Sequence, residues 1–154
     1  MLIYAAFFFA VFVTAVAVFL QVQNQELSRA ENAYAQEIAY GFADSIHTAF
    51  VAGPGFVESV SVPKDILGKR YRIFLSMASD ASAHETGIVY VNWESTGKNA
   101  SFSAPTVTAG YTHTASDMVT SSPNGEFIII DPLKGSALNI SNEGALIRIM
   151  KGLA

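Results

Sequence analysis

The first 25 residues carry no charged side chain, and this run constrains the fold more than any other feature. Residues 1–20 contain only Tyr4 and Thr14 as side chains with polar groups, and Glu26 is the first charge. A helix of 22 residues rises about 33 Å, close to the thickness of a bilayer's hydrocarbon core. Residues 1–22 are therefore predicted to form a transmembrane-competent helix. The composition agrees, because 51% hydrophobic and 14% charged residues is too apolar for an ordinary soluble domain.

The same helix is predicted to continue to residue 52, with residues 23–52 as an amphipathic extension. Apolar side chains between residues 27 and 50 recur at spacings of three and four, the period of one helix face. Only one glycine and no proline interrupt residues 1–52, and Gly53-Pro54-Gly55 then ends the helix. The residues predicted to pack against the rest of the chain are Leu27, Tyr34, Ile38, Phe42, Ile46 and Phe50.

Small residues in the apolar run repeat at helical spacing, and aromatic residues fall on other faces. Small side chains let helix backbones approach closely, so the pattern predicts packing of this helix against others. A single lipid-facing anchor is the alternative, but the apolar stripe that continues through residues 27–50 favours helix packing. The residues predicted to make helix-to-helix contacts are Ala6, Ala10, Thr14, Ala17, Phe8, Phe12 and Phe19.

After the glycine-proline break the apolar pattern changes from a period of about 3.6 to a period of two, which predicts strands. Residues 53–154 are therefore predicted to form a head domain with the architecture of a small antiparallel β-sandwich, and the fold class is α+β. Residues 56–77 are read as two strands joined by a turn. Further strands are predicted near residues 88–93, 99–102, 119–120, 127–130, 138–141 and 145–150.

Residues 95–122 form a hydroxyl-rich segment with twelve serines and threonines and only two charges, Lys98 and Asp117. A surface of this kind stays soluble when it is hydrated or carries sugar. The triplets at Asn99 and Asn139 match the acceptor sequence for N-glycosylation, which makes these asparagines the candidate glycan sites.

The sequence predicts no catalytic residue, no cofactor and no metal site. Cysteine is absent, and no G-x-S-x-G or phosphate-binding loop is present. The three histidines lie far apart, and Asp80 with His84 and Glu85 makes only a weak metal cluster that is better read as a solvated loop. An enzyme is therefore the least favoured class.

The net charge of −4 gives no basic excess for binding phosphates, so no nucleic acid is expected as a partner. One basic cluster lies around two aromatic residues, and charges of this kind usually keep an edge strand soluble. Its members are Lys64, Lys69, Arg70 and Arg72, interleaved with Tyr71 and Phe74.

This architecture resembles that of archaeal type IV pilins. A charge-free helix continues as an amphipathic helix and is followed by a Ser/Thr-rich β-domain, which opens with Val60-Ser61-Val62-Pro63 and the stretch from Gly68 to Ile73. Bacterial type IV pilins have a glutamate at the fifth mature position, whereas Ala5 in this chain matches the archaeal branch.

The resemblance implies an extracellular filament, a homopolymer with helical symmetry whose core is made of the N-terminal helices and which serves cell adhesion or surface contact. It also implies an immunoglobulin-like head, insertion in the membrane before assembly, and processing by a prepilin peptidase that leaves residue 1 as the first mature residue. The partners would be further copies of the chain and a pilus assembly machinery.

Two alternatives share the same plan of helix and β-domain. One is an archaellin, the subunit of the rotating archaeal filament, which the presence of motor genes nearby would indicate. The other is a membrane-anchored, archaellum stator-like protein whose helix stays in the membrane while its β-domain binds another surface.

Overall fold

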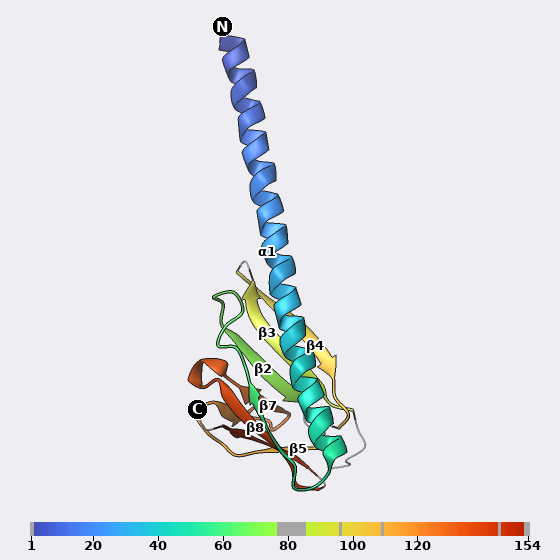
Figure 1. The fold of residues 1–154 in the computed structure, drawn as a ribbon. Coiled ribbons are helices and arrows are strands. Elements are labelled where there is room, and N and C mark those ends of the chain that lie inside the picture. Colours follow the sequence, from blue (N-terminus) through green and yellow to red (C-terminus); the bar gives the residue numbers. More distant parts are fainter. Residues whose placement is uncertain (1, 77–85, 96, 109, 145, 153–154) are drawn as a thin grey trace.

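The computed structural model describes residues 2–76, 86–95, 97–108, 110–144 and 146–152. One long helix projects from a head built of two β-sheets, so the fold is α+β, as predicted (Figure 1). The elements are α1 (Leu2–Ala52), β1 (Val57–Ser61), β2 (Tyr71–Ser76), β3 (Ile88–Ser95), β4 (Lys98–Pro105), β5 (Tyr111–His113), β6 (Val119–Ser121), β7 (Phe127–Ile130), the 3-10 helix η1 (Pro132–Lys134), β8 (Ala137–Asn142) and β9 (Ile147–Lys151).

The helix α1 covers the range that the sequence predicts. Its first half extends away from the head, and its second half lies along the sheets (Figure 1). The helix ends at Ala52 because Gly53 adopts a positive φ of 85°, a conformation that glycine takes without strain, and Pro54 cannot continue a helix.

The strands form a four-stranded sheet in the order β1-β8-β9-β5 and a five-stranded sheet in the order β4-β3-β2-β7-β6. The prediction of a purely antiparallel head is wrong in one place, because β5 runs parallel to β9, with Tyr111 opposite Ile147. The sequence also gives no signal for β5, which has only three residues. Its partner β9 lies far along the chain, so no local hairpin pattern marks it.

The two strands predicted within residues 56–77 exist, but they do not pair with each other. β1 pairs with β8, with Val60 opposite Leu138. β2 lies between β3 and β7, with Ile73 opposite both Val91 and Ile130. The segment between β1 and β2 is therefore a crossover from one sheet to the other, and not a hairpin turn.

One apolar cluster joins α1 to both sheets. Along β2, β3, β8 and β9 alternate side chains point into the core, which is the expected consequence of a period of two. α1 adds Phe42 and Ile46, both almost fully buried, to this cluster. The second half of α1 is thus part of the head's core. The immunoglobulin-like topology implied by the resemblance stays a prediction.

Candidate assembly surface

The first half of α1 is an apolar surface that the described residues of the chain leave uncovered. Every residue from Tyr4 to Leu27 is exposed, including Phe8 at 71% and Phe12 at 66%. Soluble monomers rarely expose contiguous apolar patches larger than a few hundred Å². The helix is also long and apolar enough to cross a membrane. This half of α1 therefore calls for a lipid or protein environment.

Two chemically different faces run along this surface. With about 100° of rotation per residue, the predicted small residues cluster on one side of α1 and the predicted phenylalanines lie on nearly the opposite side. The small face is a shallow strip and the aromatic face is a ridge. The small face consists of Ala6, Ala10, Thr14 and Ala17, and the aromatic ridge consists of Phe8, Phe12 and Phe19.

The one hydroxyl on the small face has its hydrogen bond inside the helix. Thr14 Oγ1 donates to the carbonyl oxygen of Ala10 at 2.8 Å. A hydroxyl satisfied in this way needs no partner from its surroundings, so the small face can enter lipid or a helix bundle without burying an unpaired polar group. Contact between these faces of different copies stays a prediction.

The first two charges of α1, beyond the apolar run, form an ion pair. Arg29 Nη1 lies 2.8 Å from Glu26 Oε1, and both side chains are mostly exposed. Exposed ion pairs of this spacing contribute a few tenths of a kcal/mol. The pair neutralises the first two charges of α1 just before the helix enters the head.

The face of α1 that packs on the head matches the predicted one in its middle but not at its ends. Of the six predicted contacts Ile38, Phe42 and Ile46 are buried, whereas Leu27, Tyr34 and Phe50 are 43%, 47% and 42% exposed. From Tyr34 to Phe50 the predicted contacts follow at steps of four, and because four residues advance a helix by about 400°, this series drifts about 40° per step. The buried residues of α1 instead combine steps of four and three, which keeps them on one face: Glu31, Ala35, Ile38, Phe42, Ile46 and Ala49, with Ala39 and Ala43 beside them.

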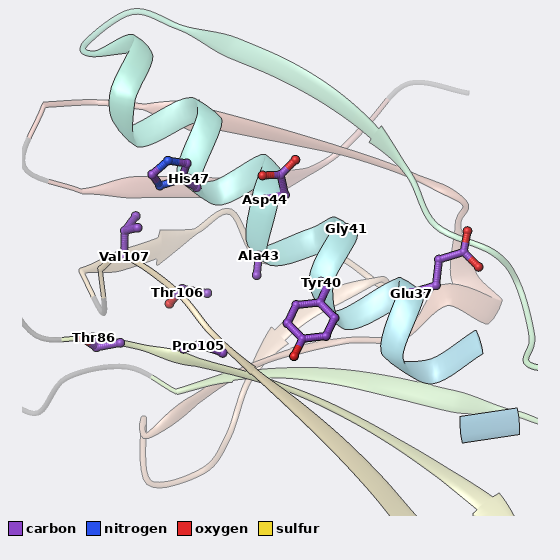
Figure 2. Close-up of a pocket in the computed structure, with 10 residues that line it drawn as sticks. All are labelled: Glu37, Tyr40, Gly41, Ala43, Asp44, His47, Thr86, Pro105, Thr106 and Val107. Atoms are coloured by element: carbon purple, nitrogen blue, oxygen red, sulfur yellow. The ribbon is translucent and has the colours of Figure 1, made fainter. Parts of the chain in front are cut away.

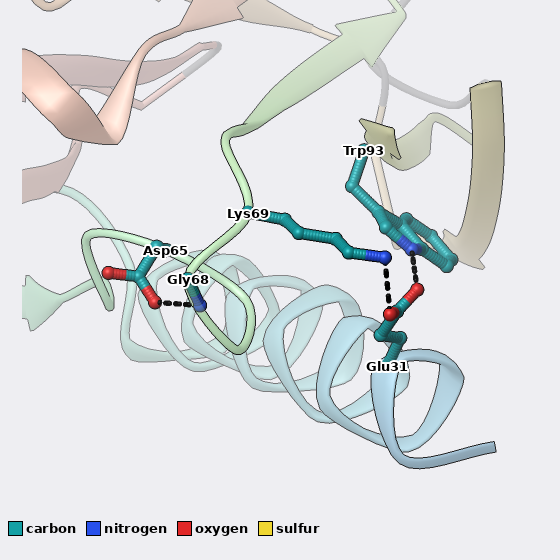
Figure 3. Close-up of polar contacts among 5 residues, drawn as sticks. All are labelled: Glu31, Asp65, Gly68, Lys69 and Trp93. Atoms are coloured by element: carbon teal, nitrogen blue, oxygen red, sulfur yellow. Dashed lines mark hydrogen bonds and ion pairs between the residues drawn. The ribbon is translucent and has the colours of Figure 1, made fainter. Parts of the chain in front are cut away.

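Glu31 is a fully buried carboxylate at the point where α1 enters the head. Its Oε1 accepts a hydrogen bond from Lys69 Nζ at 2.5 Å, and its Oε2 accepts one from Trp93 Nε1 at 3.3 Å (Figure 3). Burial alone raises the pKa of Glu31, but hydrogen bonds from Lys69, Ser95 and Trp93, together with the charge of Lys69, outweigh it and lower the pKa below its ordinary value. Glu31 is therefore ionised and paired at neutral pH.

A tight turn holds Lys69 in place for this contact. Ile66 and Lys69 exchange backbone hydrogen bonds of 2.9 and 3.0 Å, and Asp65 Oδ1 accepts from the amide of Gly68 at 2.7 Å (Figure 3). Ile66 is fully buried, which fixes the turn to the head. Sequence reasoning missed Glu31, although it lies four residues before Ala35 on the buried face.

A groove of about 830 Å³ lies between the second half of α1 and the end of β4 (Figure 2). Glu37, Asp44 and His47 line it from α1, and Pro105 and Val107 line it from the other side. Tyr40 also lines the groove and packs edge-on against Phe102, with ring centroids 5.7 Å apart. Among the described residues no group of three histidine, aspartate or glutamate side chains could hold a metal ion.

The remaining predicted residues are spread over the head. Asn99 is exposed beside the β3–β4 turn, whereas Asn139 is half-buried in β8, which is paired on both sides. Tyr71, from the basic cluster, is buried in the core, so it offers no surface for stacking on a base. The weak metal cluster of Asp80, His84 and Glu85 lies outside the described residues.

No family model matches this chain, and neither a curated protein nor a solved structure matches it. The resemblance to archaeal type IV pilins therefore stays a prediction that rests on sequence architecture.

Proposed function

We propose that this chain is a structural subunit of an archaeal type IV pilus, a filament in which the apolar half of α1 packs against the same half of other copies. One observation carries the proposal. A single continuous helix has its second half built into the core of the head and its first half fully exposed and apolar. A polymer of such chains buries the exposed half and displays the heads outside.

The continuity of α1 supports a filament over a simple tether. A helix that only anchors a domain needs an apolar span followed by a linker of any conformation. Here the helix runs without interruption from the apolar span into the head, so the apolar half has a fixed direction relative to the sheets. A fixed direction is what a regular helical assembly needs from every subunit.

The energetics support membrane storage before assembly. Transfer of the apolar half from lipid to a bundle of like helices loses little solvation energy and gains packing at the small face. Transfer to water costs about 0.8 kcal/mol for each methylene exposed. The subunit is thus expected to be inserted in a membrane first and to sit in an extracellular filament for adhesion or surface contact afterwards.

Electron microscopy of filaments sheared from the producing cells, combined with peptide mass spectrometry of the same material, tests the proposal. The expected result is thin filaments that contain this chain as their main protein. Finding the chain only in the membrane fraction, with no filament that contains it, contradicts the proposal.

A membrane-anchored binding protein is the second candidate, since α1 is long and apolar enough to cross a membrane. The substitution Ala10→Leu separates the two. It makes the span more apolar, so an anchored protein keeps its place and its binding. In a filament the larger side chain fills the small face and prevents close approach of helices, so filaments are lost while the chain stays in the membrane fraction.

A further inference from the structure

The buried part of α1 is nearly repetitive in its apolar contacts. Ala35, Ala39 and Ala43 form one row at spacings of four, and Ile38, Phe42 and Ile46 form a second row, all of them buried. Sliding the helix by four residues, about 6 Å, would place alanine on alanine and exchange isoleucine with phenylalanine. Apolar contacts of this kind discriminate between registers only through side-chain volume.

Two polar contacts, one at each end of these rows, do not repeat at four-residue spacing as the apolar contacts do. At the first end Glu31 meets Lys69 and Trp93 (Figure 3). At the other end the side chain of Asn142, which is 4% exposed, donates to the carbonyl oxygens of Ala49 at 2.9 Å and Phe50 at 3.3 Å. The contacts lie about 27 Å apart along the helix axis.

Asn142 is itself fixed by its backbone. Its amide donates to the carbonyl of Phe56 at 3.0 Å, and its carbonyl accepts from the amide of Gly55 at 2.8 Å. The same residue therefore holds the last turn of α1 and the chain that leaves it. A slide of α1 would have to unwind or rewind this turn, which breaks both side-chain hydrogen bonds.

The first contact is an ion pair with a fully buried carboxylate. A buried ion pair is often no more stable than well-packed apolar residues of similar volume, and its best-attested use is to select one register. We propose that Glu31 with Lys69, and Asn142 at the other end, are positioning residues that fix the axial register of α1 in the head. They thereby set how far the apolar half projects.

This inference does not depend on the proposed function, because it concerns the axial position of α1 relative to the sheets of its own head. If the chain forms filaments, the same register sets the distance between the helical core and the outer layer of heads. Subunits that differ in register would then make the helical symmetry of the filament less regular.

Distance measurements between two spin labels test the inference in the full chain in detergent micelles. The sequence has no cysteine, so cysteines introduced at Gln25 on α1 and Thr120 on β6, both exposed, are the only labelled sites. The unaltered pair is expected to give one narrow distance distribution. Glu31→Leu with Lys69→Met removes the ion pair and also the acceptor of Trp93 Nε1, and is expected to broaden the distribution or add a population displaced by up to about 6 Å.

Matched variants decide between positioning and plain stability. Adding Asn142→Ala is expected to increase the displaced population, and Asn142→Ala alone is expected to broaden the distribution if the combined variant does not fold. Glu26→Leu with Arg29→Met removes an exposed ion pair from the same helix and should leave the distribution narrow. A folded head with an unchanged narrow distribution in the Glu31, Lys69 and Asn142 variants overturns the proposal.

Discussion

Both halves of α1 carry large apolar side chains, but these side chains have opposite surroundings. Phe12 is 66% exposed and Phe42 is 2% exposed, although both lie on one unbroken helix. The head covers Phe42, whereas no other part of the chain that the structure describes covers Phe12. The difference teaches that periodicity identifies a helix but does not tell which partner covers each apolar face. In the second half the partner is the chain itself, and in the first half we propose that the partner is other copies of the chain.

The largest expected effect is on assembly. Ala10→Glu places a charge on the small face, where a helix bundle can neither hydrate nor pair it, so filaments should be absent from sheared cell preparations by electron microscopy. Asn99→Glu places the same charge on the exposed edge of the head and should leave filament number unchanged. Normal filaments from the Ala10→Glu cells would remove this half of α1 from the core.

A matched pair of phenylalanine substitutions tests the contrast in stability. Phe42→Ala should lower the free energy of unfolding of the head by about 3–5 kcal/mol, because it leaves a cavity in the core. Phe12→Ala should leave it unchanged within about 0.5 kcal/mol. Urea unfolding of the full chain in micelles, followed by the fluorescence of Trp93, the only tryptophan, measures both. Equal losses of unfolding free energy in the two variants would contradict the difference in burial between Phe12 and Phe42.

The buried carboxylate predicts a pH-dependent effect. The pKa of Glu31 is lowered on folding, so its pairing stabilises the head above about pH 4.5, its ordinary pKa, and this contribution is lost as the pH falls through the lower, folded value. Lys69→Met leaves the carboxylate buried without its cation and should cost about 2–3 kcal/mol at pH 7, since Lys69 itself is partly exposed.

The loss of unfolding free energy in the Lys69→Met variant should become smaller as the pH is lowered from 7 to 4, because a protonated, uncharged Glu31 can be buried at lower cost. Arg29→Met removes an exposed ion pair and serves as the control, with an expected loss below about 0.5 kcal/mol at every pH. Urea unfolding at a series of pH values measures both variants. A pH-independent deficit for Lys69→Met would show that Lys69 acts through packing alone.

The smallest expected effect is an increase in the stability of the head. Gly41 lies on the exposed face of the embedded half, and a Cβ added there meets no atom within 4 Å. Gly41→Ala should therefore raise the free energy of unfolding by about 0.5–1 kcal/mol through helix propensity. In Gly87→Ala the new Cβ would lie 2.5 Å from the carbonyl oxygen of Thr108, so the same exchange should be destabilising there. A loss of stability in Gly41→Ala would contradict the assignment of this face to solvent.

Much of the fold follows from the sequence because its signals are local. The run without charges, the period of 3.6 and the Gly53-Pro54 break predict α1 to within a residue, and alternation predicts eight of the nine described strands. β5 was not predicted because its pairing with β9 depends on a distant segment. The crossover between β1 and β2 was not predicted because an alternating pattern identifies a strand but does not identify the strand that pairs with it.

The candidate site was predicted less completely. Ile38, Phe42 and Ile46 were correctly placed on the buried face, whereas a series of four-residue steps carried the prediction away from that face to Tyr34 and Phe50. Glu31 was missed because a charged residue on an amphipathic helix is expected to face solvent. Its burial depends on Lys69 and Trp93, which are distant in sequence and come close only in the folded head.

The central claim is that Phe12 contacts other copies of the chain and Phe42 contacts only its own head. The most direct test places a photoreactive phenylalanine analogue at each position in turn in the producing cells, irradiates them, and separates the products by mass. Covalent dimers and higher multimers of the chain from position 12, with only monomers from position 42, are the predicted result. Monomers bearing lipid adducts from position 12, and no multimers, would contradict the claim.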